Sequence, residues 1–143
     1  MNPDLAVGAA RLWLGTPYLH QASVRGVGCD CLGLLRGVWR ALKGPEPCVV
    51  PPYTPDWAEP ARREDLLMAA AAYLQPVARD APESLGEVLI FRMYDGGIAK
   101  HIGLRSGLGG GAAFIHAYSG HAVLESPLSP PWARRIAGRY RLA

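Results

Sequence analysis

The hydrophobic pattern of the chain changes period near Gly86, and this change limits the architecture more than any other feature. Before it, two segments repeat apolar residues every three to four positions, which is typical of amphipathic helices. After it, short apolar or alternating runs are separated by glycine-rich turns, which is typical of strands. Helices first and strands second predict an α+β fold, with N-terminal helices packed on a C-terminal antiparallel sheet of about five strands.

Three helices are expected, over about residues 3–14, 31–43 and 61–74. The first is capped by Asn2, and its buried face is expected to carry Leu5, Ala9, Leu12 and Trp13. The second repeats apolar side chains at Cys31, Leu35, Val38 and Leu42. It also carries Gly33 and Gly37, four residues apart, which would let another backbone come close. Residues 15–28 are expected to form a loop, and the proline-rich segment 45–60 an extended surface or groove-lining stretch whose aromatics mainly anchor it.

Five strands are expected after the change of period, over residues 88–93, 98–106, 112–118, 121–126 and 138–143. A chain of 143 residues with half its residues hydrophobic is expected to form one domain, residues 1–143. The basic residues are scattered and the net charge is only +3, so no nucleic-acid partner is expected. No run is apolar enough for membrane insertion, and no leader pattern precedes the first helix, so the protein is expected to be made in the cytoplasm.

Cys31 is the candidate nucleophile, because it stands at the start of an expected helix directly after a glycine-rich loop. Unpaired main-chain N–H groups and the helix dipole at such a position favour a thiolate, which would lower the pKa of the thiol. They could also stabilise the oxyanion that forms when sulfur attacks a carbonyl. The alternative is a buried structural cysteine.

Two histidines are candidates for the base and for the residue that orients it. If residues 98–106 and 112–118 form a bulge-free hairpin, His101 lies directly opposite His116, and Ile102 and Leu104 face the other side of the sheet. A bulge would disturb this pairing. The alternative use of these histidines with Cys29 and Cys31 is a zinc site, but Cys-x-Cys is not a common zinc spacing. We expect no metal and no cofactor.

The motifs GTPY, GCDCLGLL, LGEVLIF, KHIGL and FIHA, in this order, resemble those of the NlpC-type family of papain-like cell-wall cysteine peptidases. The resemblance implies that Cys31 is the nucleophile, His101 the base and His116 the third member of the triad. It places Tyr18 beside the nucleophile, where it helps bind or polarise the substrate. We also expect Asp30 and His20 in the substrate-binding or oxyanion region, although Asp30 is better explained as a helix cap, and solvent exposure is as good an explanation for His20.

The chain departs from the family pattern at three places, with Cys29 before Asp30, Leu32 after the nucleophile, and Glu87 where relatives have Asp. The stretch HQASVRGVGCDCLGL is similar to peptidases of phage tails and gene transfer agents. The resemblance therefore implies hydrolysis of an amide in peptidoglycan stem peptides, the D-glutamyl–diamino acid bond. It also implies tail hub or baseplate partners and a site of action in the periplasm or cell wall. The alternatives are a tail adaptor that does not need catalysis, or a thiol amidase or acyltransferase acting on another amide.

Overall fold

The computed structural model of the chain describes residues 3–55 and 63–142. Its helices are α1 (Pro3–Arg11), α2 (Cys31–Lys43), α3 (Asp65–Tyr73) and α4 (Pro130–Ala133), with a short 3-10 turn at Gly109–Gly111. Its strands are β1 (Ser23–Val24), β2 (Gly28–Cys29), β3 (Gln75–Val77), β4 (Val88–Arg92), β5 (Ala99–Gly107), β6 (Ala113–Ala117), β7 (Val123–Pro127) and β8 (Ile136–Arg141). The Asn2 cap, the expected start of the third helix at residue 61, and Trp57 lie outside the described residues.

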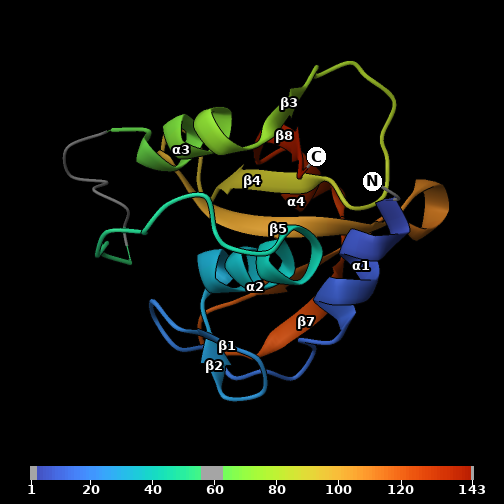
Figure 1. The fold of residues 1–143 in the computed structure, drawn as a ribbon. Helices are drawn as coiled ribbons and strands as arrows, with labels where there is room; N and C mark the ends of the chain where they lie inside the picture. Colours follow the sequence, from blue (N-terminus) through green and yellow to red (C-terminus); the bar gives the residue numbers. More distant parts are fainter. Residues whose placement is uncertain (1–2, 56–62, 143) are drawn as a thin grey trace.

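The main sheet has six antiparallel strands in the order β3-β8-β4-β5-β6-β7 (Figure 1). This confirms the expected α+β class. The additions are β3, which pairs with β8, and the small β1–β2 hairpin inside the segment expected to be a loop. No helix among the described residues is both long and apolar enough to cross a membrane.

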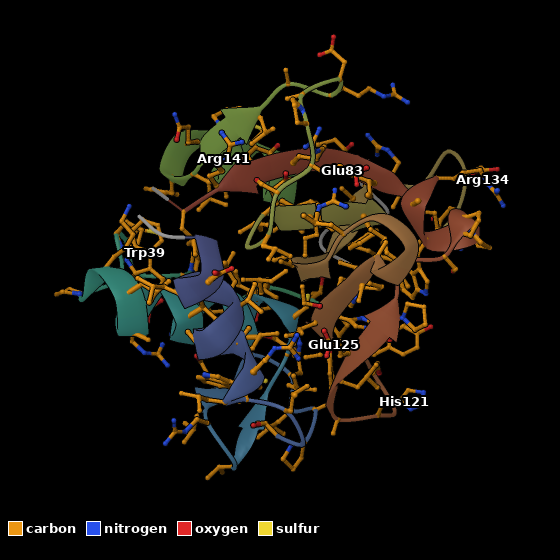
Figure 2. All side chains as sticks on the ribbon, turned by 90° about the vertical axis from the view of Figure 1, so that its right-hand side faces the viewer. Trp39, Glu83, His121, Glu125, Arg134 and Arg141 are labelled. Atoms are coloured by element: carbon orange, nitrogen blue, oxygen red, sulfur yellow. The ribbon has the colours of Figure 1, made fainter. Side chains whose placement is uncertain are left out.

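Alternation along the strands gives the sheet two different apolar faces. Val88 and Ile90 of β4 belong to the main core under α1, α2 and α3, whereas Leu89 and Phe91 pack on the opposite face with Trp132 of α4. Figure 2 shows this arrangement from the side, with α1 and α2 on one side of the sheet and the segment that carries Arg134 on the other. Because α2 packs on this first face of the sheet, the start of α2 lies against β5.

Helix α2 is held close to its neighbours at its two glycines. A Cβ atom at Gly37 would lie 2.0 Å from the Trp13 ring, and one at Gly33 would lie 1.8 Å from the Ala22 carbonyl oxygen. The expected close approach of another backbone is therefore confirmed at Gly33, whereas the neighbour of Gly37 is the Trp13 side chain. The expected apolar face of α1 is confirmed for Trp13, which is buried, and for Ala9, which packs against the core, but it is wrong for Leu5 and Leu12, which are exposed. Leu12 lies beyond the end of α1 at Arg11, in the turn that leads to Trp13.

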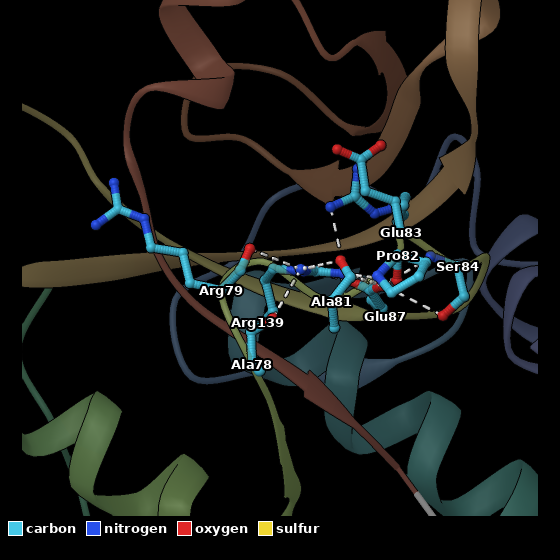
Figure 3. A network of polar contacts seen from close by, with 9 residues as sticks. Ala78, Arg79, Ala81, Pro82, Glu83, Ser84, Glu87 and Arg139 are labelled. Atoms are coloured by element: carbon cyan, nitrogen blue, oxygen red, sulfur yellow. Dashed lines mark hydrogen bonds and ion pairs between the residues drawn. The ribbon is translucent and has the colours of Figure 1, made fainter.

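A buried ion-pair network fixes the segment between β3 and β4 (Figure 3). Glu87 is fully buried and accepts hydrogen bonds from Arg139 at 2.8 and 2.9 Å and from the main chain of Ser84 at 2.7 Å. Arg139 also donates to main-chain carbonyls of the segment 78–82. Burial alone would raise the pKa of Glu87, but the hydrogen bonds from Arg139 and Ser84 and the charges of Arg105 and Arg139 outweigh it and lower the pKa.

Replacing Glu87 by Gln is expected to lower the free energy of unfolding by about 3–5 kcal/mol, because it leaves buried guanidinium charge without its partner. Urea denaturation at pH 7 measures this change. The matched control is Glu83→Gln, whose side chain is 57% exposed and lies 3.5 Å from Arg105, and for which we expect less than about 1 kcal/mol. Equal losses in the two variants would contradict a special role for Glu87.

Candidate active site

The position of Cys31 is set by the carboxylate of the residue before it. Asp30 is the N-cap of α2, and its Oδ1 accepts a hydrogen bond from the Gly33 N–H at 2.7 Å. Its Oδ2 accepts from the Gln21 N–H at 2.7 Å and from the Tyr53 hydroxyl. The prediction that Asp30 caps the helix is confirmed, and the same carboxylate ties the preceding loop and the proline-rich segment to the helix start.

The thiol of Cys31 is buried in this helix start. Burial, followed by the nearby charge of Asp30, raises its pKa to about 12. Main-chain hydrogen bonds from Ile102, Leu32 and Cys31 act in the opposite direction and do not outweigh these effects. The expectation that this position lowers the pKa of the thiol is therefore wrong, because desolvation exceeds the contribution of the main-chain N–H groups.

His101 and His116 are brought into direct contact. The Nε2 atom of His101 lies 2.8 Å from Nδ1 of His116, and the two rings meet edge to face with centroids 5.0 Å apart. The expected register of the hairpin is wrong, however, because Leu104 pairs with Ile115 and a bulge follows Arg105. The strands are displaced by two residues, which keeps every side chain on its expected face, so the histidines meet as diagonal neighbours.

Ser126 extends the histidine pair and was not anticipated. Its Oγ lies 2.9 Å from Nε2 of His116, across the β6–β7 hairpin. Phe114 is paired directly with Ser126, and Phe114 and His116 are on the same face of β6. Laying out the β6–β7 register from the sequence would have placed Ser126 next to His116.

Aromatic side chains enclose the histidine pair. The His101 ring lies 5.7 Å from the Trp132 ring and 5.9 Å from those of Phe91 and Tyr118, measured between centroids. Burial, followed by the charge of His116, lowers the pKa of His101 to about 3. Burial, followed by the charge of His121, lowers the pKa of His116 to about 4. Both rings are therefore neutral at pH 7.

The Cys31 thiol lies beside the main chain of β5 at Ile102, the residue after His101. The main-chain N–H of Ile102 is hydrogen bonded to the thiol, and the Ile102 side chain belongs to the core under α2. The His101 side chain instead packs with Phe91 and Trp132. Among the described residues, no hydrogen bond joins the Cys31 thiol to the His101 ring, and none engages Nδ1 of His101. The structure therefore places the Cys31 thiol beside the main chain of β5, next to the residue that carries the His101 ring.

Tyr18 and His20 both lie near the helix start. Tyr18 is half-buried and forms an isolated bridge with Cys29. Burial, and then the charges of Cys31, Asp30 and Cys29, raise the pKa of Tyr18 to about 12, so that its hydroxyl remains a hydrogen-bond donor. The His20 ring contacts Tyr53 edge to face, and its Nδ1 atom lies 3.7 Å from Asp30 Oδ2.

The overall structure is similar to several solved proteins. An NlpC/P60 family protein from Bacillus cereus matches with a TM-score of 0.66 and 21% identity, over 99% of this chain and 40% of that one. NlpC1 from Trichomonas vaginalis matches with a TM-score of 0.63 and 22% identity, over 96% and 42%. The NlpC/p60 domain of the peptidoglycan hydrolase SagA matches with a TM-score of 0.58 and 21% identity, over 90% of this chain and 91% of that domain.

The chain has the NlpC/P60 fold. It spans about two fifths of the Bacillus cereus and Trichomonas vaginalis proteins and nearly the whole SagA domain. No protein-family model and no curated protein matches the sequence. At these identities the likeness concerns the fold.

The raised pKa of Cys31 predicts how its alkylation depends on pH. Only the thiolate reacts with iodoacetamide, so a thiol with a pKa of about 12 should react slowly at neutral pH. Its rate should then rise about tenfold for each pH unit up to pH 10. Timed alkylation followed by peptide mass spectrometry measures the rate at Cys31 separately from Cys29 and Cys48. A rate that levels off below pH 8 would contradict the raised pKa.

Proposed function

We propose that this chain is a cysteine peptidase that hydrolyses an amide bond in peptidoglycan peptides. The observation that carries the proposal is the position of Cys31, whose thiol is held by main-chain N–H groups at a helix start and by that of Ile102. The adjacent residue, His101, forms the 2.8 Å contact with His116. A nucleophile, a base and an orienting group in this order are the parts that covalent amide hydrolysis needs.

The contacts of the histidine pair accommodate transfer of the Cys31 proton to His101. If Nδ1 of His101 is to accept the Cys31 proton, its Nε2 must carry hydrogen and donate to Nδ1 of His116. Nε2 of His116 then carries hydrogen and donates to Ser126 Oγ. This single assignment satisfies both observed contacts, at 2.8 and 2.9 Å. Ser126 therefore holds the tautomer of His116, and His116 holds that of His101.

In the proposed reaction the thiol and the imidazole are both neutral before substrate binds. His101 accepts the thiol proton as sulfur attacks the amide carbon, and a tetrahedral oxyanion forms. The main-chain N–H groups of Cys31 and Leu32 stabilise this oxyanion, with the Tyr18 hydroxyl as a further donor. His101 then protonates the leaving amine, and water attacks the thioester with His101 again as the base.

The scissile bond and the route to the cell wall are further parts of the proposal. The sequence resemblance supports a D-glutamyl–diamino acid bond. The similarity of residues 20–34 to peptidases of phage tails supports delivery within a phage-like tail, with hub or baseplate proteins as partners. Absence of the protein from purified particles would exclude delivery of this kind.

Cys31→Ala is expected to reduce cleavage of a muropeptide containing D-glutamate and a diamino acid by about a thousandfold or more, because it removes the sulfur that attacks the amide and forms the thioester. Mass spectrometry of the products measures cleavage, and thermal unfolding verifies that the variant is folded. A folded wild-type protein that leaves muropeptides intact would contradict the peptidase proposal and favour the adaptor. Cleavage of other amides alone would favour the amidase or acyltransferase.

Ser126→Ala should lower kcat about tenfold and leave KM nearly unchanged, because it removes the acceptor that fixes His116 without touching the substrate. Ser126→Thr keeps the hydroxyl and should restore most of the rate. The control is Ser119→Ala. Ser119 lies on an exposed turn, so its replacement should have no effect. A purely structural role for Ser126 would be indicated if the alanine and threonine variants lost activity equally.

A further inference from the structure

A large cavity lies between α2, α3 and the sheet, beneath the described part of the proline-rich segment. Its volume is about 690 Å³, within the range of sites that bind small molecules. Its apolar wall includes Leu32 and Leu35 of α2, Leu66 and Ala70 of α3, and Ile90 and Ile102 of the sheet. Residues 46–54 form a further wall, and Figure 1 shows this segment leaving the end of α2 in the direction of α3.

The charged side chains among the described lining residues are paired with one another. Arg36 contacts Glu46 at 2.6 Å, and Arg63 contacts Asp65 at 3.6 Å. An ion entering the cavity would have to break one of these pairs and would lose its hydration, which is costly. The walls therefore match an uncharged apolar group rather than an anion or a cation.

The cavity adjoins the proposed nucleophile. Leu32 and Ile102 line it, and main-chain hydrogen bonds from the same two residues lower the pKa of the Cys31 thiol. Tyr53 also lines it and donates its hydroxyl hydrogen bond to Asp30, the cap of the same helix. A group bound in the cavity is thus separated from the thiol by only one layer of residues.

We propose that this cavity binds the hydrocarbon chain of a lipid or an acyl group. The aliphatic walls, the internally paired charges and the volume support a flexible apolar chain over a polar stem peptide, which could not satisfy its amide groups there. The proposal extends the proposed function by adding a site for an apolar part of the substrate or of a second ligand. Binding itself does not depend on catalysis and is testable when cleavage is absent.

The test uses uncharged n-alkanols of increasing length and the folded Cys31→Ala protein, which removes the nucleophile from the assay. Cys48 lines the cavity and is half-buried, so a bound chain should slow its reaction with N-ethylmaleimide. The concentration of alkanol that gives half protection measures affinity. We expect affinity to rise about fourfold for each added methylene until the cavity is filled.

A matched pair of variants on α3 locates the binding site. Ala69 lines the cavity, and Ala69→Trp should weaken binding at least tenfold by filling it. The neighbouring Met68 is 69% exposed and is not among the lining residues, so Met68→Trp should bind as before. Thermal unfolding shows that both variants are folded. If Ala69→Trp is unfolded, protection of Cys48 in the parent protein decides the question.

Three outcomes would overturn the proposal: no protection of Cys48, affinity that does not depend on chain length, or equal binding by the two tryptophan variants. A fourth is a dimer, detected by sedimentation, that Ala69→Trp dissociates, since a second copy would then cover this surface. If the wild-type protein does not cleave muropeptides but alkanols still protect Cys48, the proposed function is rejected and the binding site is retained.

Discussion

The geometry around Cys31 depends on one carboxylate. Asp30 accepts hydrogen bonds from the Gly33 N–H within α2, from the Gln21 N–H in the preceding loop, and from the Tyr53 hydroxyl beyond the helix. Two other segments are thereby fixed to the start of the helix. The same negative charge, together with burial, raises the pKa of Cys31. The group that positions the nucleophile therefore also opposes its ionisation, and proton transfer to a neutral base becomes necessary during the reaction.

The strands and helices that carry strong periodic patterns were predictable, and their contacts were only partly so. Helix α2 has the expected bounds, because its cap, its apolar period and its terminal glycine agree. The contact between His101 and His116 was also predicted, although by a register that is wrong by two residues. An even displacement preserves the face of each side chain, and long imidazole rings can bridge the diagonal distance.

What the sequence did not reveal depends on contacts between distant segments. β3 is only three residues long and is defined by its pairing with β8. The β1–β2 hairpin consists of two-residue strands, too short for any alternating pattern. The direction of the Cys31 pKa shift was predicted wrongly. The sequence indicates that Cys31 begins a helix, but its burial depends on how α2 packs against the sheet. The cavity beside it likewise arises from four separate parts of the chain.

The two glycines of α2 have a consequence for how this chain can vary. Positions 33 and 37 face a carbonyl oxygen and an indole ring at distances that exclude even a methyl group. Leu12, in contrast, is 64% exposed and contributes little to the core. Tolerance to substitution should therefore not follow residue size or hydrophobicity here. Gly33 and Gly37 should accept no larger residue, whereas Leu12 should accept many different side chains.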